Sequence, residues 1–405
     1  MANINNASRL RRFLLLRRSS ATFVKWCFII VVLSHVLIQL QLFLSLHRQD
    51  FSESQHVKEE FNPASRFNGV IPSSKSVRHP TVIIIGTQKG GTTALWSYLS
   101  AHPQMAPPRT IESHFFDRIP PEKQTLERYL GKYFNMSLIL KSRHLRSFEK
   151  TPVYMFDPKV ARRVAALVPW VKVIALLRHP VERAYSHYKM VARAHVVSKS
   201  RGEKKPFGNF GECVRTDLDL LGLAGVVEQF DRWKSRKTGE EGVSSLLVLE
   251  KSDAAARELF AAWEKYYDML DEVDIERGCG GIVGRGMYAI QLPYYFDAFR
   301  NDARLWKERF LILKSEDMRM DGRSGSDNID YLRTVTNFID IQSFKNVTQI
   351  TNEDVGSKGI SATRAAPVVG TDEVEKTRET LRRFYEPFNK LLLPLLGDEW
   401  EHPWE

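Results

Sequence analysis

Short apolar runs alternate with longer stretches of helical periodicity along most of the chain. Three apolar runs rich in β-branched residues favour buried strands, at residues 81–85, 171–177 and 310–313. Helical patterns occupy residues 92–101, 159–167, 181–195, 254–270, 331–338 and 372–393. The alternation predicts an α/β fold, in which helices flank a central parallel sheet. We expect this domain to occupy residues 80–405.

A longer apolar segment precedes the predicted domain. Residues 26–46 contain no Asp, Glu, Lys or Arg, enough for one transmembrane helix across a hydrocarbon core of about 30 Å. The basic residues of the amino terminus lie mainly before this segment, so residues 1–25 are expected to form a cytosolic basic tail. Residues 47–79 are polar and aperiodic, as in a flexible stem. The prediction is a single-pass type II anchor; a cleaved signal peptide is the main alternative, and an organellar transit peptide is less favoured.

Composition narrows the class of protein. With 43% hydrophobic and 26% charged residues, the chain is neither collagenous nor largely disordered. The net charge of +11 is concentrated in the amino-terminal tail, and no nucleic-acid motif is present, so we expect no nucleic-acid partner. If the domain is lumenal, Cys213 and Cys279 can pair or remain free thiols, and Asn135 and Asn346 are possible glycosylation acceptors. The sequence leaves these alternatives and the oligomeric state open.

A glycine-containing turn joins the first predicted strand to the first predicted helix. Residues 86–93 read GTQKGGTT, and such a turn directs backbone N–H groups and a helix N-terminus at an anion. The pattern is P-loop-like, but Thr92 stands where nucleotide triphosphatases have lysine, and the lysine is Lys89. The second strand ends in Arg178 where those enzymes place a magnesium-binding Asp. We therefore expect no metal site, and a magnesium-dependent kinase is disfavoured.

Four segments, in order, resemble the family of membrane-anchored carbohydrate sulfotransferases. Residues 86–93 resemble that family's loop for the 5′-phosphosulfate of PAPS (3′-phosphoadenosine 5′-phosphosulfate). Residues 177–186 (LRHPVERAYS) resemble the strand and helix start that hold the 3′-phosphate. Residues 112–117 (ESHFFD) and 149–152 (EKTP) resemble acceptor-side segments of heparan and chondroitin sulfate sulfotransferases. The likeness extends from about residue 80 to the end, and it implies PAPS as co-substrate, a polysaccharide acceptor and a Golgi membrane location.

The resemblance also implies roles for individual residues. Sulfuryl transfer needs in-line positioning and neutralisation of charge on the transferred group and leaving oxygen. Lys89 is expected at the leaving oxygen, Glu112 as the base that accepts the acceptor proton, and Lys150 as an orienting group; His114 is the alternative base. The implied nucleotide-binding residues are Lys89, Gly90, Gly91, Thr92, Thr93, Arg178, Ser186, Lys358 and Gly359.

The expected function is sulfuryl transfer from PAPS to a hydroxyl of a polysaccharide or glycosaminoglycan, with a leaning toward chondroitin-like acceptors. A heparan-type N- or O-sulfotransferase is one alternative, and a non-enzymatic anchored glycan-binding protein is another. Three departures from the family pattern bear on the acceptor and adenosine contacts. Ile111 stands where many relatives have lysine, Ile360 follows the Lys-Gly pair at 358–359, and no cysteine follows Cys279.

Overall fold

The computed structural model describes the part of the chain that carries the predicted domain. The described residues are 78–142, 144–200, 208–236, 254–277, 279–299, 306–318, 327–343, 371–401 and 403–404. The predicted tail and anchor, the stem up to residue 77, Asn346, Lys358 and Gly359 lie outside them. Within the described ranges, no helix has the length and apolar character needed to cross a membrane.

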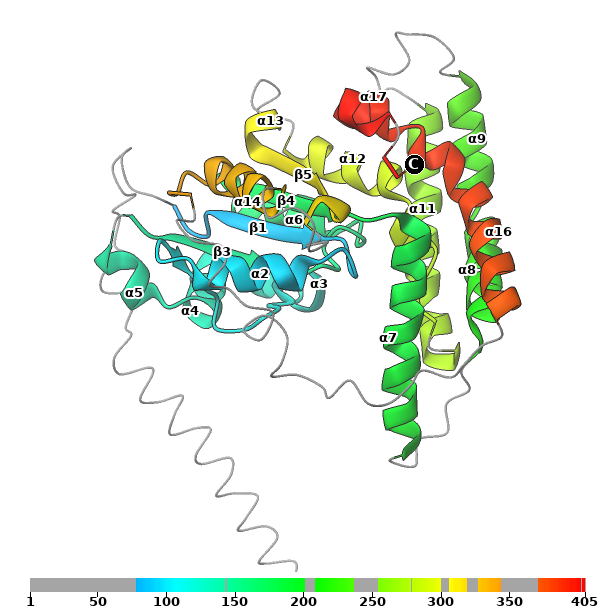
Figure 1. Ribbon diagram of the computed structural model, residues 1–405, viewed down its shortest axis with the longest axis horizontal. Helices are drawn as coiled ribbons and strands as arrows, with labels where there is room; N and C mark the ends of the chain where they lie inside the picture. The colour runs from blue at the N-terminus through cyan, green and yellow to red at the C-terminus, as the bar shows by residue number, and fades with distance from the viewer. Residues whose placement is uncertain are drawn as a thin grey trace, which may run out of the picture. The chain divides into compact units, whose positions relative to one another are not determined.

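Five parallel strands form one sheet in the order β2-β3-β1-β4-β5 (Figure 1). Val82 in β1 lies opposite Phe148 in β3 and Lys172 in β4, and Ile174 in β4 lies opposite Leu311 in β5. The strands are β1 (Val82–Gly86), β2 (Met105–Ala106), β3 (Arg146–Lys150), β4 (Lys172–Leu177) and β5 (Phe310–Lys314). The prediction of an α/β fold with a central parallel sheet is confirmed.

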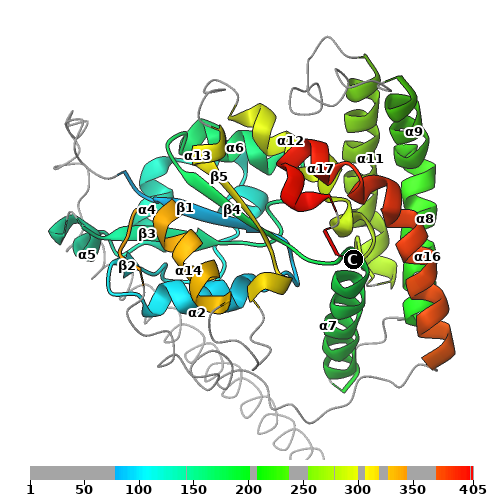
Figure 2. The same cartoon turned by 45° about the horizontal axis from the view of Figure 1, so that its top comes forward.

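Helices cover both faces of the sheet, as parallel strands with apolar side chains on both faces require. On one face, Val82 and Ile174 pack with Leu95 of α2 and with Leu332 and Val335 of α14. Helices α6 and α12 contact each other and lie on the opposite side of the sheet (Figure 2). These four helices are α2 (Thr92–Ala101), α14 (Asp327–Phe338), α6 (Val160–Leu167) and α12 (Tyr288–Ala298).

A group of longer helices stands beside the sheet, toward the carboxyl end of β1 (Figure 1). Its members are α7 (Pro180–Ser200), α8 (Phe210–Ala224), α9 (Val226–Arg236), α11 (Ala254–Arg277) and α16 (Thr371–Asn389). Helix α8 begins with a capping box in which Asn209 and Glu212 each bind the other's backbone N–H. The shorter helices are α3 (Phe115–Arg118), α4 (Leu126–Tyr133), α5 (Met136–Lys141), α13 (Trp306–Arg309) and α17 (Leu392–Leu396).

The structure differs from the expected elements at several places: strand β2 and helices α8, α9 and α12 were not predicted, and two further differences have a clear local cause. The single helix predicted at 372–393 is wrong, because α16 ends at Asn389 and α17 begins at Leu392. Pro394, which has no N–H to donate, is accommodated in the first turn of the new helix. Strand β3 was not predicted, because its sequence RSFEK has no apolar run. The open question about the cysteines is answered: Cys213 and Cys279 are paired.

Candidate active site

The phosphate loop lies between the end of β1 and the start of α2. The Thr87 N–H donates to the carbonyl of Leu176 in β4, and the Gly90 N–H donates to the carbonyl of Thr87, both at 2.9 Å. A Cβ at Gly90 would lie 2.6 Å from the Leu176 oxygen, so only glycine allows this close approach. Gly91 has a φ of 89° at the N-cap of α2, and no side chain caps this end. The helix N-terminus can therefore serve an anion.

A group of cations surrounds the side chain of Lys89. Its pKa is lowered first by burial and then by the positive charges of Arg178, Arg193, Lys189 and Arg183. Arg178 is fixed at the loop because its guanidinium donates to the carbonyl of Lys89 at 3.0 Å. The positive charges of these four residues repel the ammonium group of Lys89. A ligand with several negative charges would relieve this repulsion. The site is suited to a polyanion such as a nucleotide with separate phosphate groups.

The chain that follows α11 supports the nucleotide side of the site. The Tyr288 hydroxyl donates to the carbonyl of Arg178 at 2.7 Å, and the Thr87 hydroxyl donates to the carbonyl of Arg285 at 3.5 Å. These two contacts connect the chain around η3 (Gly284–Gly286) to the ends of β1 and β4. A segment distant in sequence therefore supports both the phosphate loop and Arg178, which directly follows β4.

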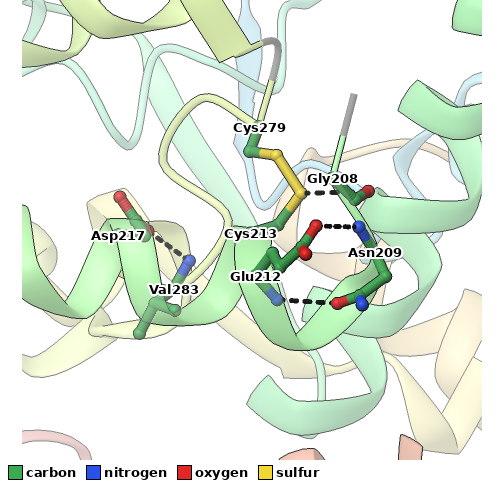
Figure 3. The surroundings of a disulfide bond; sticks show 7 residues. All are labelled: Gly208, Asn209, Glu212, Cys213, Asp217, Cys279 and Val283. Atoms are coloured by element: carbon green, nitrogen blue, oxygen red, sulfur yellow. Dashed lines mark hydrogen bonds between the residues drawn. A yellow bond between two sulfur atoms is a disulfide. The ribbon is translucent and has the colours of Figure 1, made fainter. Parts of the chain in front are cut away.

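Helix α8 holds that bracing segment by two side chains (Figure 3). Cys213 forms a disulfide with Cys279, and Asp217, one helical turn later, accepts the N–H groups of Val283 and Gly284 at 2.5 and 3.1 Å. Burial raises the pKa of Asp217, and these backbone donors act in the opposite direction. Both links fix the chain between α11 and α12 to the group of longer helices.

The acceptor side of the site is built around Glu112. Its carboxylate lies 2.7 Å from Lys150 Nζ and 3.3 Å from His114 Nε2. His114 Nδ1 in turn lies 2.7 Å from Asp117, three residues later at the start of α3. These contacts form a series of four groups in which positive and negative charges alternate: Lys150, Glu112, His114 and Asp117. This arrangement orients both carboxylates and the imidazole.

The alternating charges shift the pKa values of the two central groups. Burial alone would raise the pKa of Glu112, but hydrogen bonds from His114 and Lys150 outweigh it and hold the pKa at about 2. Hydrogen bonds to Asp117 and then Glu112 raise the pKa of His114 to about 9, against the opposing effect of burial. At neutral pH, Glu112 is ionised and can accept a proton, whereas His114 is already protonated and cannot.

Lys150 connects the acceptor side to the phosphate loop. Only 1% of its side chain is exposed, and its Nζ lies 3.4 Å from Thr93 Oγ1 as well as 2.7 Å from Glu112. Strand β3, which ends at Lys150, pairs directly with β1, whose end leads into the loop. The adjacent strands therefore place the ammonium group between the proposed base and the N-terminus of α2.

The structure brings together most of the residues that the sequence predicted. Lys89, Gly90, Gly91, Thr92 and Thr93 form the loop and the start of α2, and Arg178 contacts the loop. Ser186 lies half-buried in α7. Lys358 and Gly359 are outside the described residues, and their roles stay predictions. No group of three or more His, Cys, Asp or Glu side chains in the described ranges is arranged to hold a metal.

Several residues of the site were not recognised in the sequence. Asp117 lies in the segment 112–117 quoted from the sequence but was given no role, because its contact with His114 depends on the left-handed backbone of His114 and not on helical spacing. Arg183 and Lys189 act on Lys89 from α7, across the fold, and no local pattern predicts that. Glu149, next to Lys150, lies in the quoted segment 149–152 but was given no role of its own, and its burial was not expected.

Comparison with known proteins agrees with this geometry. The family model described as a sulfotransferase domain matches residues 79–351, more than half of the chain. The chain therefore belongs to the sulfotransferase family, and the resemblance to carbohydrate sulfotransferases is confirmed.

Three relatives illustrate the similarity. A bifunctional heparan sulfate N-deacetylase/N-sulfotransferase 1 of Caenorhabditis briggsae is 32% identical over 34% of this chain and 16% of the relative. Human heparan sulfate glucosamine 3-O-sulfotransferase 6 is 36% identical over 31% of this chain and 33% of the relative. The membrane-associated sulfotransferase kil1 of Dictyostelium discoideum is 26% identical over 67% of this chain and 59% of the relative. The matched region thus spans less than two thirds of each relative.

Proposed function

We propose that this protein transfers the sulfuryl group of PAPS to a hydroxyl of a polysaccharide. The observation that carries the proposal is the position of Lys150 between Glu112 and Thr93, at 2.7 and 3.4 Å. Such a lysine can contact a transferred anionic group on one side and the proton-accepting carboxylate on the other. A pure glycan-binding protein or a magnesium-dependent kinase has no need of this arrangement.

The PAPS co-substrate fits the residues of the loop. Its 5′-phosphosulfate would lie at the N-terminus of α2, held by backbone N–H groups and by Thr92 and Thr93. Arg178 and Ser186 would bind the 3′-phosphate, as their matched positions imply. The cations around Lys89 would neutralise the phosphates, and Lys358 and Gly359 would contact the adenosine portion.

The proposed reaction is an in-line displacement at sulfur. The acceptor oxygen forms a bond to sulfur while the bond from sulfur to the 5′-phosphate oxygen breaks. Glu112 takes the hydroxyl proton, and Lys89 stabilises the charge that develops on the leaving oxygen. A carboxyl with a pKa of about 2 is a weak base. Contact of the Lys150 ammonium group with the sulfuryl oxygens would draw part of its positive charge away from Glu112 and raise the pKa of that carboxyl as the transfer begins.

For the acceptor, we propose a glycosaminoglycan of the heparan type over a chondroitin-like chain. Support comes from the two relatives named as heparan sulfate enzymes, one an N-sulfotransferase and one a 3-O-sulfotransferase. Exposed Ile111, next to Glu112, would give the acceptor an apolar contact where many relatives have lysine.

We also propose that the protein is a type II Golgi membrane enzyme with its catalytic domain in the lumen. The disulfide between Cys213 and Cys279 supports an oxidising compartment. Asn135 is exposed at the N-cap of α5, where its side-chain oxygen accepts the Leu138 N–H, and its amide nitrogen can carry a glycan. The Dictyostelium relative is named as membrane-associated.

Transfer of labelled sulfate from PAPS tests the proposed activity. The purified full-length protein is incubated with labelled PAPS and either desulfated heparan or desulfated chondroitin chains. We expect incorporation into the heparan substrate, and at least a hundredfold less for Lys89→Ala. Incorporation into neither substrate, by a protein that binds both the nucleotide and glycans, would instead favour a non-enzymatic role.

A further inference from the structure

Two hydroxyl oxygens bind four consecutive backbone N–H groups of residues 113–116. Thr151 Oγ1 accepts the first two, at 3.1 and 3.4 Å. Tyr154 Oη accepts the next two, at 2.9 and 3.2 Å. Both hydroxyls belong to the chain that follows β3, so the segment carrying His114 is attached to the sheet through side chains.

The attachment holds a strained backbone. His114 has a φ of 49°, in the left-handed region that is unfavourable for a residue other than glycine. In this conformation its ring reaches both Glu112 and Asp117. Any loss of the N–H contacts would allow the segment to relax and would separate the ring from its two carboxylate partners.

Glu149 organises the hydroxyl groups that make these contacts. It has no exposed surface, and its carboxyl group receives hydrogen bonds from Ser113, Tyr129 and Thr151, the last at 3.1 Å. The Ser113 hydroxyl also lies 2.9 Å from Tyr154 Oη. We call these four hydroxyl residues, Ser113, Tyr129, Thr151 and Tyr154, the hydroxyl network.

The chemistry of the hydroxyl network is directional. A hydroxyl that donates to Glu149 turns its lone pairs toward another donor, which for Thr151 is the backbone of residues 113–114. Burial is the largest influence on the Glu149 carboxyl and raises its pKa to about 7, while the hydrogen bonds from the hydroxyl groups act in the opposite direction. Burial of a carboxyl group costs free energy, which the hydrogen bonds from the hydroxyl network offset.

We propose that Glu149 is a positioning residue for sulfuryl transfer, which acts through the hydroxyl network to hold residues 113–116. Through that segment it sets the contacts of His114 with Glu112 and Asp117. The carboxyl group of Glu149 bonds to Ser113, Tyr129 and Thr151, so its effect on Glu112 passes through the segment that carries His114. This inference rests on the proposed function only where Glu112 is named as the base. The contacts of His114 with Glu112 and Asp117 are present without substrate.

The pKa of His114, followed by NMR of the full-length protein with labelled histidine, tests the inference without any catalytic readout. The signal of His114 is assigned from its absence in His114→Asn. In Glu149→Gln, we expect the His114 pKa to fall from about 9 toward 6.5, because the ring loses its carboxylate partners. Glu122→Gln, at an exposed glutamate of η2 (Pro121–Lys123), is the matched control and should leave the value unchanged.

A second pair of variants covers the case in which Glu149→Gln does not fold. Thr151→Val removes one hydroxyl of the network and should lower the His114 pKa, whereas Thr151→Ser keeps the hydroxyl and should restore it. In transfer assays, Glu149→Gln and Thr151→Val should lower kcat about tenfold or more, with the affinity for 3′-phosphoadenosine 5′-phosphate within twofold of the original. An unchanged His114 pKa in the variants that fold would overturn the inference. A normal pKa response in a protein without transferase activity would instead refute only the proposed function.

Discussion

Lys150 Nζ lies 2.7 Å from Oε1 of Glu112, although the lysine side chain is almost wholly buried. A buried ammonium requires a partner, and here the partner is a carboxylate that is about one third exposed. The pair therefore presents an ionised oxygen acceptor at the surface with its counter-charge beneath it. Because Lys150 also contacts Thr93, the same ion pair joins the acceptor side to the phosphate loop.

Removing the charge of Glu112 should abolish most of the transfer activity. Glu112→Gln keeps the size of the side chain but cannot accept a proton, so we expect kcat to fall by about 10²- to 10⁴-fold. Affinity for 3′-phosphoadenosine 5′-phosphate should change little, because Glu112 lies on the acceptor side. Steady-state kinetics and nucleotide binding measure the two quantities separately.

The matched control for Glu112 is Glu127→Gln, at an exposed position of α4. It should leave kcat unchanged. If Glu112→Gln retained near-normal turnover, another group would have to accept the proton and Glu112 would lose its assigned role.

Arg178 should distinguish nucleotides by their 3′-phosphate. We expect Arg178→Ala to lower the affinity for 3′-phosphoadenosine 5′-phosphate at least tenfold, because one charge-assisted contact is lost. The affinity for adenosine 5′-phosphate should fall far less. Arg162→Ala, at an exposed arginine of α6, serves as the control. Equal losses for both nucleotides, measured by calorimetry, would place the 3′-phosphate elsewhere.

Protonated His114 should stabilise the fold in a defined pH range. Its pKa is about 9 in the folded protein and 6.5 for the unperturbed side chain, so the contribution is complete below pH 6.5 and is lost as the pH rises through 9. Allowing for its partial exposure, we expect the contribution to be about 1 kcal/mol. The free energies of unfolding of the original protein and of His114→Asn, measured with denaturant, should differ most at pH 6 and least at pH 10. A difference independent of pH would contradict the ion contacts of His114.

The disulfide should make a measurable contribution to stability. Cys213 and Cys279 are separated by 66 positions, and a link of this span is expected to contribute about 2–4 kcal/mol. Reductant should therefore lower the free energy of unfolding of the original protein. It should have no effect on the double variant Cys213→Ser, Cys279→Ser, which serves as the control. Equal stability of the original protein with and without reductant would show that the bond is absent or energetically neutral.

Local patterns predicted the central elements of the fold closely. The helix expected at residues 92–101 is α2, and the strand expected at 171–177 is β4 with one residue fewer. Both have a strong local signal, a helical pattern in one case and a continuous apolar run in the other. Strand β3 has neither signal, because two of its five residues are the charged Glu149 and Lys150. Their burial is possible only because residues from other segments bind them, Tyr129 in one case and Glu112 in the other.

The candidate site was predictable where it depends on consecutive residues. The loop at 86–93 and the arginine at the end of β4 are continuous patterns, and the structure places them in contact. The orientation of His114 toward carboxylates was not predictable, since it depends on a left-handed backbone held by Thr151 and Tyr154. Such interactions across segments leave no mark on the local sequence.

The phosphate loop and Arg178 together are proposed to bind a 3′-phosphorylated adenine nucleotide. Thermal unfolding of the purified full-length protein tests this binding directly, because a ligand that binds only the folded state raises the unfolding temperature. We expect 3′-phosphoadenosine 5′-phosphate to raise that temperature without magnesium, and ATP with magnesium to have little effect. Stabilisation by ATP with magnesium alone would exclude a site for the 3′-phosphorylated nucleotide and would indicate a kinase.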